Sequence, residues 1–226
     1  MEDQESLTDD RVQVGYNTAL CLNEIGLEIA QSDNEAERGV GLVVQIAAEL
    51  IAGSTLCAFR EVYYSSAALH RQIIEVMHLL SYFAKDATAS ARWVNIPLMS
   101  KPSPEFQPGH LRKATVIGSI EYRNHCELAG HPRIGGSIFL SGSKHREEPF
   151  QVRSRITGAL IAAQMKDLVL TDGLRHTHDV FHAAVDAIKA VGLMGDLFYF
   201  HLLNQQIEID TWASQDPLAS ITIASD

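Results

Sequence analysis

Apolar residues recur along this chain at intervals of three and four positions, whereas the strict alternation typical of strands is scarce. This periodicity predicts helices along most of the sequence, with these approximate ranges: 10–30, 32–53, 54–86, 110–131, 150–170, 174–192 and 196–212. Ser32 and Glu35 have the spacing of a capping box, so the second helix is expected to begin there. The third range is expected to form one long helix, bent near Ser65 and Ser66. The pattern therefore predicts an all-α bundle of about seven helices.

Two loop segments separate these helices. The segment 95–109 contains four of the seven prolines and is expected to be a linker. The segment 132–148 is rich in glycine and serine, with a short extended piece expected at 137–140. Because the helices on both sides of the proline-rich linker need partners to bury their apolar faces, residues 1–226 are expected to fold as one domain.

The composition is that of a globular protein with excess negative charge. Hydrophobic residues make up 46% of the chain and charged residues 20%, and the formal charge is −10 at pH 7. Such a chain is not expected to devote its surface to nucleic-acid backbone, although a local basic cleft stays compatible with it. Three scattered cysteines and a polar, acidic start favour a cytoplasmic protein without a leader peptide. The most apolar stretch, 40–53, is interrupted by Gln45 and Glu49, so no membrane span is expected.

A cluster of histidines, in the motif LRHTHDVFH, marks the helix predicted over 174–192. On a helical projection of about 100° per residue, six polar residues fall within one narrow stripe: Arg175, His178, Asp179, His182, Asp186 and Lys189. Apolar residues such as Phe181 and Ile188 cover the other side. Two interpretations stay open. The stripe is either a solvated helix face with Asp172 as the N-cap, or the lining of a cleft within the bundle or between two subunits.

The spacing of Arg175, His176 and His182 resembles the arginine–histidine motif of HEPN ribonucleases. Members of that family are small helical bundles whose motifs meet across a dimer cleft, so the resemblance implies a homodimer that acts on RNA. It also implies that Arg175 holds the scissile phosphate and that His182 assists attack by the ribose 2′-hydroxyl, with His176 beside them. The implied activity is that of a metal-independent endoribonuclease of the toxin or phage-defence type, which needs no cofactor.

A second polar stripe runs along the helix predicted over 54–86, and it contains Arg60, Tyr64, Arg71, Glu75, His78 and Tyr82. Arg71 and Glu75 are four residues apart, a spacing at which they could pair. The stretches LHRQIIEVMHLLSYF and YRNHCELAGHPR also resemble an uncharacterised bacterial helical family, which supports the fold and implies no chemistry. This stripe is either a structural seam between helices or part of one polar pocket. The members expected for such a pocket are Arg71, Glu75, Glu127, His131 and His178.

Two alternatives to an RNA-cleaving enzyme follow from the same side chains. The first is a metal-binding bundle, because Glu75 precedes His78, and Asp179 precedes His182, by the three residues that ferritin-like bundles use to bind two metal ions. Such a site also needs carboxylates from two further helices, for which the chain offers Glu49 and Glu127. The second alternative is a non-catalytic helical interaction module. The sequence contains no glycine-rich nucleotide loop and no recognisable nucleophile motif.

Overall fold

The computed structural model describes residues 9–97, 103–114, 139, 155–193 and 195–215. Within these residues the chain forms seven α-helices and one short 3-10 helix. The elements are α1 (Asp10–Ile29), α2 (Glu35–Phe59), α3 (Tyr63–Lys85), α4 (Ala87–Val94), η1 (Pro104–Phe106), α5 (Pro108–Ala114), α8 (Arg155–Ala190) and α9 (Asp196–Gln215). The described residues contain no strand, and the prediction of an all-α bundle is confirmed.

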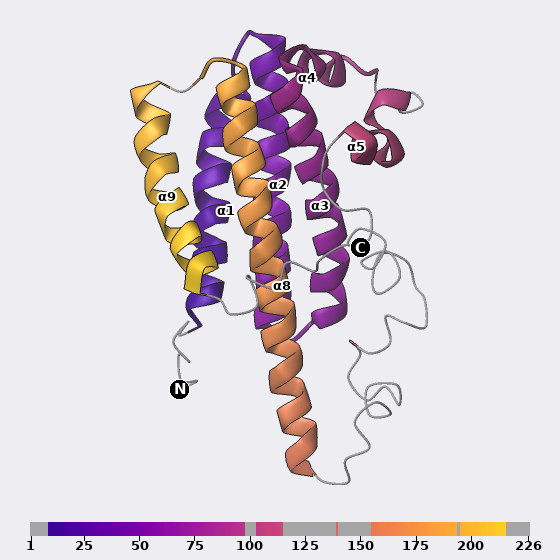
Figure 1. The fold of residues 1–226 in the computed structure, drawn as a ribbon, viewed down its shortest axis with the longest axis vertical. Coiled ribbons are helices and arrows are strands. Elements are labelled where there is room, and N and C mark those ends of the chain that lie inside the picture. Colours follow the sequence, from indigo (N-terminus) through magenta and orange to yellow (C-terminus); the bar gives the residue numbers. More distant parts are fainter. Residues whose placement is uncertain (1–8, 98–102, 115–138, 140–154, 194, 216–226) are drawn as a thin grey trace.

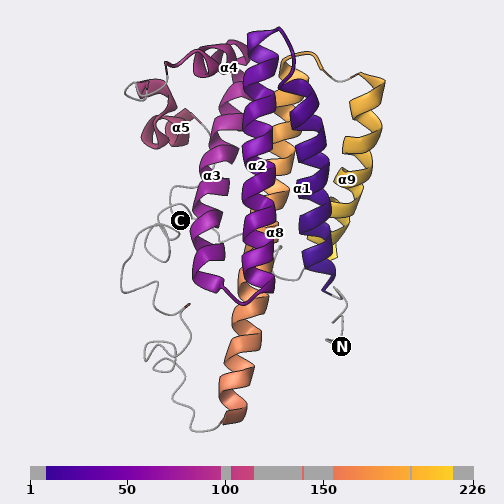
Figure 2. The same ribbon diagram turned by 180° about the vertical axis from the view of Figure 1, so that it is seen from behind.

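Four long helices stand side by side and form the body of the bundle: α1, α2, α3 and α8 (Figure 1). Helix α2 contacts α1, α3, α4 and α8. Helix α9 packs against α1 and α8 at one edge, and α4 and α5 lie toward the opposite edge, in contact with α3 (Figure 2). Helix α8 therefore contacts α3 on one of its sides and α9 on another.

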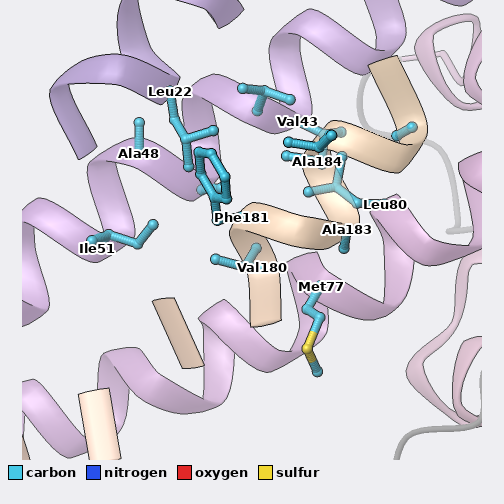
Figure 3. Packing of buried hydrophobic residues seen from close by; sticks show 14 of the residues in the cluster. Leu22, Val43, Ala48, Ile51, Met77, Leu80, Val180, Phe181, Ala183 and Ala184 are labelled. Carbon is cyan, nitrogen blue, oxygen red and sulfur yellow. The ribbon is translucent and has the colours of Figure 1, made fainter. Parts of the chain in front are cut away.

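The core is a continuous set of aliphatic and aromatic side chains from the long helices. Ile51 of α2, Leu80 of α3 and Phe181 of α8 are completely buried, and Phe181 lies next to Leu22 of α1 (Figure 3). By length and composition alone, α2 is the one described helix that is apolar enough to cross a membrane. Its position among four neighbouring helices accounts for the same composition, because a core helix is apolar on most of its surface.

Helix α2 begins two positions later than the sequence predicts, with a different capping residue. The Oδ1 atom of Asn34 accepts a hydrogen bond from the backbone N–H of Ala36 at 2.9 Å, so Asn34 is the N-cap. The Ser32 hydroxyl instead hydrogen bonds to Glu37 at 2.6 Å. The predicted capping box is wrong in its residues, because the backbone enters the helix two positions later than the box requires.

The third predicted helix is in fact two helices. Helix α2 continues to Phe59, and α3 begins at Tyr63 after a tight turn. Glu61 has a φ of 60°, in the left-handed region that ends a right-handed helix. The hydroxyls of Ser54 and Ser66 lie 3.0 Å apart, so the chain doubles back and the two helices run antiparallel. Apolar periodicity does not reveal this break, because each helix keeps a buried face up to the turn.

The break predicted between the fifth and sixth helices, 150–170 and 174–192, is absent. Helix α8 is a continuous helix of 36 residues that passes through Asp172 and Gly173. Asp172 is therefore not an N-cap. A Cβ atom on residue 173 would lie 2.7 Å from His70 Nε2, so glycine here gives room to a side chain of α3 and does not end the helix.

The proline-rich segment is a linker only in part. Residues Pro104–Phe106 form the short 3-10 helix, and Pro108 is the first residue of α5. Proline is well suited to a first helical position, since its missing N–H would have no partner there. The predicted continuation of this helix toward residue 131 lies outside the described residues. So does the segment 132–148 apart from Phe139, which is buried in a small apolar cluster with α3 and α8.

Glycines allow α2 to approach its neighbours at backbone distance. A Cβ atom on Gly41 would lie 2.4 Å from the backbone nitrogen of Ala30. One on Gly39 would lie 2.4 Å from the backbone oxygen of Ser90. Packed backbone cannot move aside as the end of a flexible side chain can, so both positions need a residue without a Cβ atom.

We expect Gly41→Ala to lower the free energy of unfolding by about 1–3 kcal/mol, because overpacking against backbone outweighs the gain in helix propensity. Gly53→Ala is a matched control on the same helix, since a Cβ there meets only the flexible end of Leu69, at 3.3 Å. The control should leave stability unchanged or raise it by up to about 1 kcal/mol. Urea denaturation followed by circular dichroism measures both, and equal effects would contradict the close approach of α2 to α1.

Candidate functional site

The histidines of the motif LRHTHDVFH face two different neighbours. The side chain of His176 is 1% exposed and points toward α3. Those of His178 and His182 are 29% and 35% exposed and face α9. Residues two positions apart on a helix project about 200° from each other, which separates His176 from His178. The motif therefore serves two separate clusters of titratable side chains.

The first of these, the α8–α9 cluster, consists of His178, His182 and Asp210. One carboxylate oxygen of Asp210, Oδ1, lies 2.8 Å from His182 Nε2 and 3.2 Å from His178 Nε2. The two imidazole rings are 4.6 Å apart between their centroids. The histidines are one turn apart on α8, and α9 holds the carboxylate opposite them. Three ligand atoms, two nitrogens and one oxygen, therefore converge within 4.8 Å of one another.

Hydrogen bonds set the charges in the α8–α9 cluster. A contact of 3.2 Å between His178 Nδ1 and Asp179 raises the pKa of this histidine above its ordinary value, and Asp210 adds to the effect. Burial by itself would raise the pKa of Asp210, but the hydrogen bond from His182 lowers it below its ordinary value. The Asp210 carboxylate is therefore ionised at neutral pH, and a positive charge between it and the imidazoles is favoured.

The geometry of the α8–α9 cluster fits a transition-metal ion. In a tetrahedral site with bonds of about 2.0 Å, ligand atoms lie about 3.3 Å apart. The distances of 2.8 and 3.2 Å from Asp210 Oδ1 to the two imidazole nitrogens are close to this value. Asp179 accepts from the other ring nitrogen of His178, as carboxylates commonly do behind metal-binding histidines. The side chain of Asp210 is 42% exposed, so one side of the cluster is open to water.

The second cluster, the α3–α8 seam, consists of two buried histidines, His70 and His176, and the partly exposed Asp172. His70 Nδ1 lies 3.3 Å from Asp172 Oδ2, and His176 Nε2 lies 3.7 Å from Asp172 Oδ1. The other ring nitrogen of His70 lies 3.5 Å from the hydroxyl of Ser66. The side chains of both histidines are 1% exposed. A polar layer thus crosses the interface between the two helices.

The seam already holds the positive charge that its carboxylate needs. Arg175 Nη1 lies 3.8 Å from Asp172 Oδ1. Burial by itself would raise the pKa of Asp172, but hydrogen bonds from His176 and His70 hold it well below its ordinary range. Burial lowers the pKa of His70, so a neutral imidazole stands beside an ionised carboxylate. The three ligand atoms lie close enough together to hold a metal ion, but the neighbouring guanidinium makes a second cation unfavourable.

The residues of the predicted ferritin-like site are not brought together as one group. Glu75 pairs with Arg71 at 3.1 Å, as their spacing indicated. His78 is buried on the core side of α3. Asp179 and His182 take part in the α8–α9 cluster. Within the described residues, the His/Cys/Asp/Glu groups that converge closely enough to bind a metal are the two clusters above.

The three residues of the arginine–histidine motif do not share one side of α8. Arg175 and His182 are seven positions apart on the partly exposed side, with 38% and 35% of their side chains exposed. His176 instead lies in the buried seam. Two members of the predicted polar pocket lie outside the described residues: Glu127 and His131.

Sequence reasoning does not find His70 or Asp210 as members of these clusters. Each joins its cluster from a helix other than α8, and helical periodicity says nothing about which helices become neighbours. The four-residue spacing of His178 and His182 is the local signal of a two-histidine site. A search for its third member would have had to consider every carboxylate on the other helices.

Comparisons with known protein families, with characterised proteins and with solved structures find no match to this chain. A proposal for the function of this chain therefore rests on the chemistry of the two clusters. Of the two, the α8–α9 cluster is the more exposed, since both histidines of the seam are 1% exposed. Within the part of the chain that the structure describes, it pairs with no arginine or lysine.

We expect Asp172→Ala to lower the free energy of unfolding by about 3 kcal/mol, because it leaves two buried imidazoles without their shared acceptor. Asp186 lies on the same helix, and its side chain is 66% exposed. Asp186→Ala should therefore change the free energy of unfolding by less than about 0.5 kcal/mol. Chemical denaturation of both variants compares the two carboxylates. Similar losses would show that the seam does not support the packing of α3 on α8.

Proposed function

We propose that this protein is a metal-binding helical bundle that holds a divalent transition-metal ion at His178, His182 and Asp210. The observation that carries the proposal is the convergence of two imidazole nitrogens on one carboxylate oxygen, at 2.8 and 3.2 Å. Neutral imidazole and carboxylate are suitable ligands for zinc and for neighbouring transition metals. A divalent cation would bind His178 at Nε2, the ring nitrogen that faces Asp210, while the Nδ1–H group continues to donate to Asp179.

The exposure of the cluster supports a site with an open coordination position. Sites with three protein ligands and one position left for water or substrate are typical of catalytic metal centres, whereas structural sites are closed by four protein ligands. An ion bound in this way lowers the pKa of its water ligand and polarises a substrate oxygen. The contribution of the chain itself is to hold His178 in position through Asp179 and to keep the ionised Asp210 opposite both imidazoles.

Calorimetric titration of EDTA-treated protein with Zn²⁺ tests the site. We expect saturable binding by the wild type and a loss of affinity of at least about 100-fold in His182→Ala and in Asp210→Asn, since each removes a ligand. Asp179→Asn should weaken binding about 10–100-fold, the range for carboxylates that orient a ligand histidine. Asp186→Asn lies one turn beyond the cluster on the same helix and should bind Zn²⁺ like the wild type.

Two outcomes would contradict the metal site. The first is the absence of Zn²⁺ binding by folded wild-type protein. The second is binding that survives unchanged in His182→Ala and Asp210→Asn, because the ion would then be held elsewhere. Circular dichroism of each variant separates a lost ligand from a lost fold. Both side chains are partly exposed, so we expect the two variants to stay folded.

A second candidate function is RNA cleavage without a metal, which the resemblance to HEPN ribonucleases implies. The observation that favours it is that Arg175 and His182 lie on the same partly exposed side of α8. In this arrangement the guanidinium would bind a phosphate and the imidazole would exchange a proton with the ribose 2′-hydroxyl. The buried His176 would contribute only to the packing of α8 on α3.

Cleavage of single-stranded RNA in the presence of EDTA distinguishes the two candidates. If α8 carries a ribonuclease, Arg175→Ala and His182→Ala should each abolish cleavage while the fold is kept. His178→Ala should then retain cleavage, although it removes a proposed metal ligand. Failure of the wild type to cut RNA under these conditions would reject this second candidate and leave the metal site unaffected.

A further inference from the structure

Helix α9 contributes one member of the α8–α9 cluster from outside the four-helix body. It packs against α1 and α8 at the edge of the bundle (Figures 1 and 2). The segment that joins it to α8 contains Gly192, whose φ of 83° is readily adopted by glycine and rarely by other residues. Two of the three ligand atoms are therefore fixed on one rigid helix, and the third depends on the docking of another.

The interface that holds α9 in place contains both polar and apolar contacts. Gln205 donates a hydrogen bond to Thr18 at 2.9 Å, and Asn17 donates one to Glu208 at 3.0 Å. Each such bond replaces hydrogen bonds to water, so its net contribution to docking is small. Among the apolar residues of α9 whose side chains the structure describes, Leu202 and Ile209 are the buried ones.

The ion pairs between α8 and α9 are also weak in the absence of a metal. Asp210 is 42% exposed, and His178 and His182 are 29% and 35% exposed. Partly exposed pairs of this kind contribute little to stability, because water and salt screen the charges. Coordinate bonds from one ion to both helices would add a far larger attraction between them. The cluster is thus placed where an ion has most effect on the docking of α9.

We propose that a metal ion bound at His178, His182 and Asp210 fastens α9 to the bundle, so that metal binding and α9 docking are thermodynamically linked. This inference rests on the proposed metal site. Because the full ligand set exists only when α9 is docked, the ion stabilises the docked state, and the apparent affinity for the ion scales with the docked fraction. Metal binding thereby makes α9 more ordered.

Hydrogen–deuterium exchange of the full chain, with and without saturating Zn²⁺, measures the first half of the linkage. We expect Zn²⁺ to slow exchange in peptides from 200–215 at least about tenfold, with little change in α2. In Asp210→Asn, Zn²⁺ should leave the exchange of α9 unchanged, because no ligand remains on that helix. Slowed exchange of α9 in this variant would overturn the linkage through Asp210.

The reciprocal half is tested by a pair of variants on α9 that leave all three ligands intact. Leu202→Ala removes a side chain that is 1% exposed and loosens docking, whereas Ile207→Ala removes one that is 58% exposed. If Leu202→Ala lowers the docked fraction of α9 to about a tenth, we expect the apparent Kd for Zn²⁺ to rise about tenfold. Ile207→Ala should leave this Kd unchanged. Faster exchange of α9 in Leu202→Ala without Zn²⁺ confirms that this helix is loosened.

The outcomes separate this inference from the function on which it rests. Zn²⁺ binding by the wild type without slower exchange of α9 would overturn the linkage and leave the metal site in place. A Kd for Leu202→Ala equal to that of the wild type, with α9 loosened, would do the same. Absence of Zn²⁺ binding by the wild type would overturn the metal site itself and the linkage with it.

Discussion

The continuity of α8 is the constraint on which the rest of the structure depends. This helix runs for 36 residues without interruption, and its backbone hydrogen bonds fix the direction of every side chain along it. A rotation of about 100° per residue places His176 against α3 and His178 with His182 against α9. A break in the helix near Gly173 would have removed this fixed relation between residue number and side-chain direction. Because the helix continues, one motif supplies residues to two clusters on opposite sides of α8.

The two clusters have similar side chains and opposite electrostatic outcomes. In the α3–α8 seam, Arg175 stands beside Asp172, so the negative charge of the carboxylate is balanced within the protein. Burial also keeps His70 neutral, which leaves an imidazole to act as a donor. The α8–α9 cluster is half exposed, and Asp179 and Asp210 surround its histidines with negative charge. The first arrangement supports packing, and the second favours a cation from solution.

The helical elements follow from the sequence because each buries one face, and burial of a face requires the apolar periodicity that the sequence displays. Two of the errors in helix boundaries, at Glu61 and at Gly173, have one physical cause. The turn at Glu61 joins two helices that each keep buried residues up to the turn, Ala58 and Tyr63, so the apolar pattern is not interrupted there. Gly173 is a helix breaker by propensity, yet here its missing Cβ makes room for His70 of a neighbouring helix. Neither case is visible in local sequence, since both depend on the packing of α3.

The sequence by itself determined the all-helical class and the pairing of Arg71 with Glu75. It also placed His178 and His182 one turn apart on a polar stripe. Spacings within a helix are set by its fixed pitch, which is why they can be read from residue numbers. The tertiary structure decided that Asp210, 28 residues beyond His182, completes a cluster at the surface, and that His70 joins Asp172 in the interior. Such contacts between helices arise from the packing of the whole bundle, and the spacing of residues along the chain carries no information about them.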